Sequence, residues 1–172
     1  MNAYSAFALG DANIGKHSFV HRVMYNQFIG REIEVGNVNK QVIVDDEVCI
    51  FSVTTVTDSE LDDHFIRIAE GIFLMYSITS RRSFDNLVNH LNLILRLKAS
   101  DDVPMVIVGT KCDLEQERQV FKEELEELAK EFDRPFFEVS SKSNRNIEEC
   151  MIQIIQDIKT SKAKYQKQTF QK

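Results

Sequence analysis

The sequence is poor in cysteine. Its three cysteines, Cys49, Cys112 and Cys150, are widely spaced and form no CxxC pair. This argues against a disulfide framework, which needs paired cysteines, and against a structural zinc site, which uses closely spaced ones. A chain of this composition is typical of a reducing compartment.

Long hydrophobic runs and an excess of positive charge are also missing. The apolar runs fall far short of the ~20 residues that a membrane-spanning helix needs, and no basic stretch precedes an apolar run near the N-terminus, as it does in a secretory signal. The formal net charge is −6, which disfavours binding to nucleic acid. We therefore expect a cytoplasmic protein that binds no nucleic acid.

What the sequence does contain is an alternation of strand-like and helix-like segments. Its 172 residues, 43% of them hydrophobic, suit one domain with a full core. Helical crossovers predict parallel strands, so we expect an α/β fold with a six-stranded, mostly parallel sheet flanked by five helices. The predicted strands are 3–9, 38–44, 48–55, 72–77, 105–108 and 136–139, with an antiparallel hairpin at 38–55, and the predicted helices are 15–27, 60–70, 84–98, 122–132 and 147–158.

Residues 10–18 match a phosphate-binding loop at all but one position. The pattern is G-x-x-x-x-G-K-[ST], and Gly10, Gly15 and Lys16 satisfy it, whereas His17 stands where a Ser or Thr hydroxyl would contact magnesium. The loop follows a predicted strand and opens a predicted helix, so its N–H groups would point at a phosphate that Lys16 also reaches. From this motif alone, a plain glycine-rich turn is an equally good interpretation.

Two further loops follow predicted strands and raise the odds of a ligand site. They are Val108–Asp113, with the sequence VGTKCD, and Glu138–Lys142, with the sequence EVSSK. Because open α/β sheets bind ligands at the carboxyl ends of parallel strands, we expect both loops to lie beside the phosphate loop.

These three loops, in this order and spacing, resemble those of the Ras superfamily of small GTPases, most closely its Ras/Rap branch. The resemblance covers residues 3–160 and includes residues 40–49, 83–86 and 101–109. It implies the P-loop NTPase fold, with a Ras-like domain over 1–160 and a short basic tail over 161–172, which we expect to be disordered. It also implies a monomer that binds GTP or GDP and acts in signalling through protein effectors or regulators.

The resemblance also assigns nucleotide contacts residue by residue. Asp113 corresponds to the aspartate that accepts hydrogen bonds from the guanine N1–H and 2-amino groups, and Lys111 to the lysine whose stem covers the base. Phe28 corresponds to an aromatic residue beside the guanine, although core packing is an equally good interpretation. The implied nucleotide-binding residues are Asn13, Ile14, Gly15, Lys16, His17, Ser18, Phe28, Thr110, Lys111, Asp113, Ser140, Ser141 and Lys142.

The sequence departs from the family pattern at the expected magnesium ligands. His17 replaces a hydroxyl, and Thr55 falls where the family has a metal-linked aspartate. The first switch segment contains no Thr, and Ile33 or Glu34 lies closest to the expected threonine. Because magnesium prefers oxygen ligands at short range, the resemblance leaves magnesium binding doubtful.

Other departures affect hydrolysis and base recognition. Asp58 falls at the glycine whose N–H senses the γ-phosphate, and Ser59 at the glutamine that orients the attacking water. Thr110 replaces the Asn of the N-K-x-D motif, which predicts weaker guanine binding. Since phosphoryl transfer depends on positioning and charge neutralisation, we expect negligible hydrolysis, and we predict no catalytic or metal-binding residue.

Three hypotheses follow for the function. The first is an atypical guanine-nucleotide binder with impaired magnesium-dependent switching and very low hydrolysis. The second is a nucleotide-free pseudo-GTPase that acts as a protein–protein interaction module, and the third, which we rank lowest, is an active GTPase with a rearranged site. The lysines of residues 161–172 come without the prenylated cysteine box of Ras relatives, so we expect at most transient membrane contact.

Overall fold

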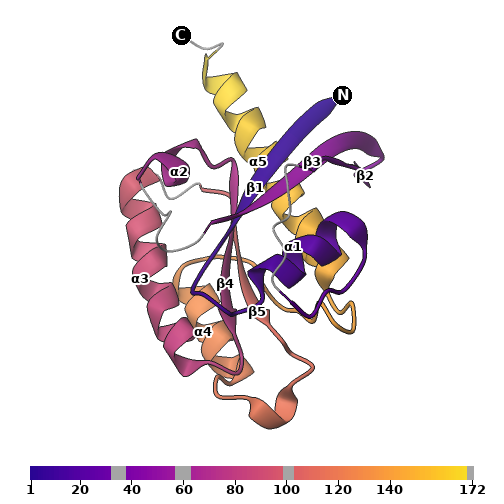
Figure 1. Ribbon diagram of the computed structural model, residues 1–172. Helices are drawn as coiled ribbons and strands as arrows, with labels where there is room; N and C mark the ends of the chain where they lie inside the picture. Colours follow the sequence, from indigo (N-terminus) through magenta and orange to yellow (C-terminus); the bar gives the residue numbers. More distant parts are fainter. Residues whose placement is uncertain (32–37, 57–62, 99–102, 170–172) are drawn as a thin grey trace.

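Six strands form one sheet with helices on both faces (Figure 1). The computed structural model describes residues 1–31, 38–56, 63–98 and 103–169. The strand order is β2-β3-β1-β4-β5-β6, and only the β2–β3 pair is antiparallel. The predicted α/β fold and the hairpin are therefore confirmed. The strands are β1 (Asn2–Leu9), β2 (Lys40–Val44), β3 (Glu47–Val56), β4 (Gly71–Ser77), β5 (Met105–Thr110) and β6 (Phe136–Glu138).

The helices divide between the two faces of the sheet. Helices α1 and α5 share one hydrophobic core with β4 side chains such as Phe73 and Met75. Helices α2, α3 and α4 share the other core with Leu74 and Tyr76. Strand β4 is buried at every position, which explains its unbroken apolar run. The helices are α1 (Lys16–Tyr25), α2 (Asp63–Ile68), α3 (Arg81–Lys98), α4 (Lys122–Glu131) and α5 (Ile147–Thr169), with a short 3-10 helix, η1 (Glu115–Glu117).

Helix α5 extends well beyond its predicted end, so the prediction of disorder from residue 161 is wrong as far as Thr169. Ser161 is buried. The Lys162 ammonium lies 2.6 Å from a carboxylate oxygen of Glu70 and 5.0 Å from the ring centre of Tyr4. Both partners are distant from Lys162 in the sequence. The residues after 160 show no apolar periodicity, so the sequence pattern did not indicate that the helix continues. Residues 170–172 lie outside the described part of the chain.

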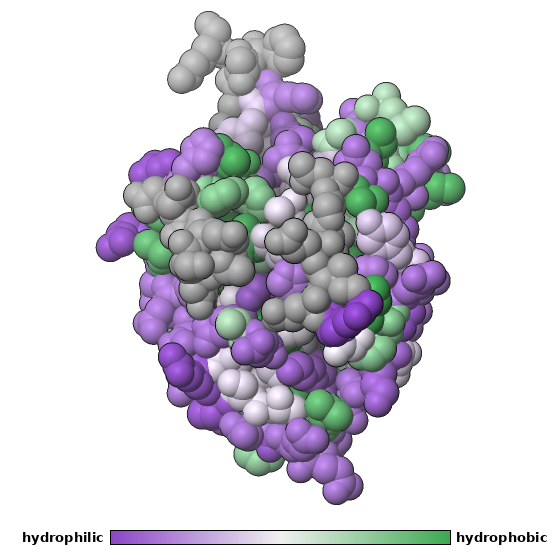
Figure 2. Space-filling model, viewed as in Figure 1, coloured by the Kyte–Doolittle hydropathy of each residue, from purple (hydrophilic) through white to green (hydrophobic). Residues whose placement is uncertain are grey.

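The surface is mostly hydrophilic in the view of Figure 2, with hydrophobic side chains at the β2–β3 hairpin. Ile43 and Val48 are paired across these strands and are 69% and 42% exposed. Within the described residues, no helix combines the length and apolar character needed to cross a membrane.

Candidate nucleotide-binding site

The phosphate loop connects β1 to α1 and is shaped by two glycines with positive φ. Gly10 has φ 151°, and a Cβ added there would lie 2.2 Å from the carbonyl oxygen of Met75. A side chain at this position would clash with β4, so only glycine fits. Gly15 has φ 96° and caps the N-terminus of α1.

Lys16 is the first residue of α1, and its side chain packs against this loop. Its side chain is 4% exposed, and its ammonium donates 2.6 Å to the Gly10 carbonyl oxygen and also donates to that of Asp11. The cation is thus held against the loop backbone at the N-terminus of a helix, where the helix dipole also favours an anion.

The loop after β5 is tied to the phosphate loop. The Thr110 hydroxyl lies 2.5 Å from the Ile14 carbonyl oxygen and 3.0 Å from that of Tyr76, and the Lys111 ammonium donates 3.0 Å to the Asn13 carbonyl. A hydroxyl has one proton, so Thr110 donates to one of its two acceptors at a time. Thr110 is 2% exposed. Its hydroxyl therefore links the two loops.

A hydrogen bond orients the carboxylate of Asp113. The Ser140 hydroxyl donates 2.7 Å to Asp113 Oδ1, while the Ser143 N–H donates 3.0 Å to the same hydroxyl oxygen. Ser140 is fully buried, whereas Asp113 is exposed at the surface of the site. The bond holds one carboxylate oxygen in place and thereby fixes the direction in which the group faces the cavity.

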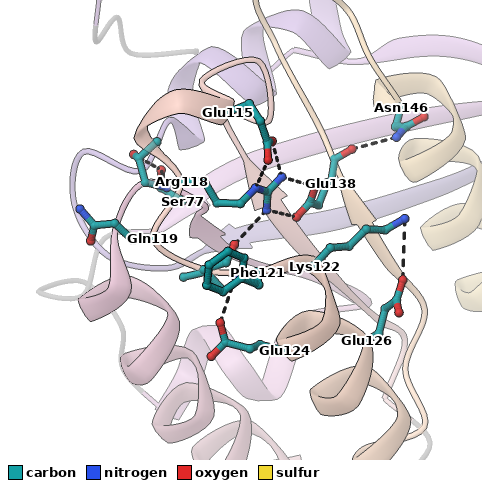
Figure 3. A network of polar contacts seen from close by, with 12 residues as sticks. Ser77, Glu115, Arg118, Gln119, Phe121, Lys122, Glu124, Glu126, Glu138 and Asn146 are labelled. Atoms are coloured by element: carbon teal, nitrogen blue, oxygen red, sulfur yellow. Dashed lines mark hydrogen bonds and ion pairs between the residues drawn. The ribbon is translucent and has the colours of Figure 1, made fainter.

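Arg118 links the loop after β5 to the end of β6 (Figure 3). Arg118 donates to both carboxylate oxygens of Glu138, at 2.7 and 2.9 Å, and to both of Glu115, each at 2.8 Å. Its side chain is only 11% exposed and that of Glu138 12%. The hydrogen bonds from Arg118 to Glu138 and then to Glu115 raise the pKa of the arginine, which keeps the guanidinium charged.

The loops enclose a cavity of about 350 Å³. Phe28 is 41% exposed at its wall, so plain core packing does not account for this residue. The Ser18 hydroxyl donates 2.9 Å to the Ile29 carbonyl oxygen and so ties α1 to the Phe28 segment. The cavity is lined by Asn13, Gly15, Ser18, Phe28, Gly30, Arg31, Thr110, Lys111, Asp113, Leu114, Ser141 and Lys142.

Four predicted site residues do not line this cavity. Ile14 is 2% exposed in the core, and only its carbonyl oxygen reaches Thr110. Lys16 is held by the phosphate loop, Ser140 acts through Asp113, and the His17 imidazole contacts β3 instead.

Three lining residues were missed by the sequence analysis. They are Gly30, Arg31 and Leu114. Each stands shortly after a predicted site residue, so extending the Phe28 and Asp113 motifs along the chain would have found them. Among the lining residues that the structure describes, the charge is mainly positive, because Arg31, Lys111 and Lys142 stand against one carboxylate, that of Asp113.

The metal side of the site is built from two substituted positions that contact each other. His17 Nε2 lies 3.4 Å from Thr55 Oγ1, and parallel pairing with β1 places Thr55 opposite Ala8. An imidazole nitrogen and a neutral hydroxyl are a poor donor set for Mg²⁺, which prefers hard oxygens in an octahedral shell. These residues therefore do not fit the ion.

The other metal-side predictions cannot be compared with the structure. Ile33, Glu34, Asp58 and Ser59 lie outside the described residues. Across residues 1–31, 38–56, 63–98 and 103–169, no group of three or more His, Cys, Asp or Glu side chains is arranged to hold a metal ion.

A larger cavity of about 570 Å³ lies elsewhere, between α5 and the loop that joins α4 to β6. Its lining includes Pro104 and Pro135, which directly precede β5 and β6. It therefore opens at the amino ends of these parallel strands, away from the edge where α/β sheets bind their ligands. The smaller cavity is the candidate site.

The strand–loop–helix cradle and the base-side loops define a P-loop α/β protein, and sequence comparison identifies its family. Residues 6–160 match the Ras family. The chain is 34% identical over 167 residues to Ras-like protein rasB of Dictyostelium discoideum, covering 93% of this chain and 84% of that protein. It is 35% identical over 169 residues to Ras-like protein 1 of Saccharomyces cerevisiae (94% and 54%) and 34% identical over 166 residues to a Ras-like protein of Laccaria bicolor (92% and 79%).

The chain therefore belongs to the Ras family of small GTPases. Membership in this family implies guanine-nucleotide binding and a role in signalling.

Proposed function

We propose that this chain binds GDP and GTP with similar affinity, with little dependence on magnesium, and hydrolyses GTP negligibly by itself. The observation that carries the proposal is the contact between His17 and Thr55. It joins the two positions from which a relative would offer oxygen ligands to the metal, while the base side keeps a carboxylate at Asp113 that the Ser140 hydroxyl orients through Oδ1.

Charge at the site supports binding without a metal. Lys16 lies against the phosphate loop, and Arg31, Lys111 and Lys142 line the cavity, where Asp113 supplies one carboxylate among the described residues. Cations at the rim of a cleft raise the local concentration of anionic ligands. They compensate part of the phosphate charge that magnesium would otherwise neutralise.

Slow hydrolysis follows from the same arrangement. Phosphoryl transfer needs a positioned water and a cation bridging the β- and γ-phosphates. The His17–Thr55 pair supplies neither function. Groups that sense the γ-phosphate also drive the switch in this class of protein. A site without them distinguishes GDP from GTP weakly.

A nucleotide-free interaction module is the second candidate. One observation favours it: the Lys16 ammonium already donates to the carbonyl oxygens of Gly10 and Asp11 within its own loop. In both candidates we infer a cytoplasmic monomer that acts through protein effectors or regulators and contacts membranes at most transiently.

The test is a titration of the purified chain with fluorescent GDP and GTP, in magnesium and in EDTA. We expect four dissociation constants that agree within about threefold, or 0.7 kcal/mol. Lys16→Ala should weaken all four, and thermal melting of this variant checks that it is folded.

Two outcomes would contradict the proposal. Absence of binding to either nucleotide, together with no GDP or GTP released on denaturation, would favour the interaction module. Brisk GTP turnover that stops in EDTA would instead make the chain an ordinary magnesium-dependent GTPase.

A further inference from the structure

The loop that carries Ser141 and Lys142 is held from outside by an arginine of α1. Arg22 Nε donates 2.7 Å to the Ser141 carbonyl oxygen, and Nη2 donates 3.3 Å to that of Lys142. The remaining nitrogen, Nη1, donates 2.8 Å to the carbonyl oxygen of Asn26 at the end of α1. One guanidinium thus joins the helix that begins at the phosphate loop to the loop on the base side.

This contact determines where the backbone of the loop points. In a trans peptide the C=O and the following N–H lie on opposite sides of the chain. When Arg22 holds the Ser141 carbonyl, the Lys142 N–H is directed away from Arg22. Both residues line the cavity. Among the described residues, neither the Ser141 nor the Lys142 N–H has a hydrogen-bond partner.

The site therefore offers a ligand two kinds of group at its base end. The Asp113 carboxylate accepts hydrogen bonds, and the N–H groups of Ser141 and Lys142 donate them. A purine with a carbonyl at C6 and N–H at N1 matches this pattern. A purine with an amino group at C6 would place that N–H donor against the N–H donors of the loop, so these polar groups would remain unpaired.

We propose that Arg22 is a positioning residue that sets the preference for 6-oxopurine over 6-aminopurine nucleotides, a role that rests on the nucleotide binding proposed above. By holding the carbonyl oxygen of Ser141 outward, it keeps the Lys142 N–H available to the base, beside the Ser141 N–H, whose own peptide is held through the bond from the Arg145 N–H to the Ser140 carbonyl oxygen. Arg22 does not touch the ligand itself; it acts through the loop.

The test compares two neutral variants of similar length. Arg22→Gln keeps an amide N–H that can reach the Ser141 carbonyl, whereas Arg22→Met has no donor. We expect the ratio of GDP to ADP affinity to fall about tenfold in Arg22→Met and to stay within about threefold in Arg22→Gln. Since both variants lose the same charge, their difference reports hydrogen bonding alone.

The outcomes separate this proposal from the one it rests on. If the unaltered chain binds no nucleotide, both proposals fail. If it binds GDP and Arg22→Met keeps the original GDP-to-ADP ratio, only the role of Arg22 fails. An equal loss in Arg22→Gln and Arg22→Met would also overturn it, because charge would then be the cause.

A measurement on the unaltered chain covers the case in which Arg22→Met does not fold. Amide signals of Ser141 and Lys142 should move downfield in ¹⁵N-resolved NMR spectra when GDP is added, and should move less with ADP. Unchanged signals, or equal shifts with both nucleotides, would overturn the proposal.

Discussion

The base side of the site, formed by Asp113, Ser140 and the Arg118–Glu138 pair, is held very differently from its metal side, formed by His17 and Thr55. On the base side, Arg118 and Glu138 form a bidentate pair with 11% and 12% side-chain exposure, and Ser140 fixes Asp113 at 2.7 Å. On the metal side, the His17–Thr55 contact is 3.4 Å long. Recognition depends on rigidly held groups, and among the residues that the structure describes these lie mainly on the base side.

This difference teaches that holding a nucleotide and splitting it are separable. The phosphate loop needs only glycines, a helix N-terminus and Lys16, all of which lie close together in the sequence. Hydrolysis needs further groups from other segments, brought to one point. A chain can therefore change the second set while the first remains.

The largest effect should come from removing the carboxylate on the base side. Asp113→Ala deletes the acceptor for two donors of guanine, and we expect GDP affinity to fall by at least about 100-fold, since each hydrogen bond to a charged group is worth roughly 1.5–3 kcal/mol. Asp85→Ala, an exposed aspartate of α3, is the matched control. An equal loss in both variants would mean that overall charge, rather than the base contact, matters.

The next prediction concerns the restoration of oxygen ligands for magnesium at positions 17 and 55. A double variant, His17→Ser with Thr55→Asp, supplies a hydroxyl and a carboxylate in place of the imidazole–hydroxyl contact. We expect GTP affinity to become about tenfold higher in magnesium than in EDTA, because the ion now has hard oxygen ligands. His17→Ala, which removes the imidazole and adds no oxygen, should show no such gain. If the double variant binds GTP equally well in magnesium and in EDTA, the residues at positions 17 and 55 do not account for the weak magnesium dependence.

A smaller effect is expected at Thr110, whose hydroxyl links the loop after β5 to the phosphate loop. Thr110→Val keeps the shape of the side chain but removes the buried hydroxyl that reaches Ile14, and we expect the free energy of unfolding to fall by about 1–2 kcal/mol in urea titrations. Thr160→Val is the control, because Thr160 makes a similar bond on an exposed turn of α5. A fall in GDP affinity as large as that of Asp113→Ala would show that the two sides do not act independently.

The fold could be predicted because its signals are local. The buried run of β4 and the apolar period of α3 are each contained within one element, and the structure has both elements where they were expected. The end of α5 could not be predicted from a local pattern, since the contacts of its last turns, such as those of Lys162 with Glu70 and Tyr4, are to residues far away in the chain.

The site also contains one part that the sequence predicts and one part that it does not. Gly10, Gly15 and Lys16 form a contiguous pattern, and their arrangement follows from it. Arg22 contacts Ser141, which is 119 residues away. No spacing rule connects these two residues, because parallel strands and their helices bring them together only in three dimensions.

The smallest predicted effect concerns the exposed ion pair between Arg81 and Glu124. Figure 3 shows Glu124 and its bond to Phe121 near the Arg118 pair. Glu124 accepts from Arg81 at 2.7 and 2.8 Å and from the Phe121 N–H at 3.0 Å. The bonds from Arg81, and then that from Phe121, lower the pKa of Glu124 from 4.5 to about 2. A lowered pKa in the folded state stabilises the fold above pH 4.5, and this stabilisation is lost as the pH falls toward 2.

Glu124→Gln should therefore flatten the acid side of the stability profile. We expect the unaltered chain to lose more melting temperature between pH 5 and pH 3 than the variant does, by an amount worth less than about 1 kcal/mol, because the pair is solvent-screened. Glu126→Gln, whose partner Lys122 lies 3.7 Å away, is the control and should change the profile less. Parallel profiles for all three proteins would mean that exposed pairs on the base side contribute nothing, and that the rigidity of this side comes from its buried contacts alone.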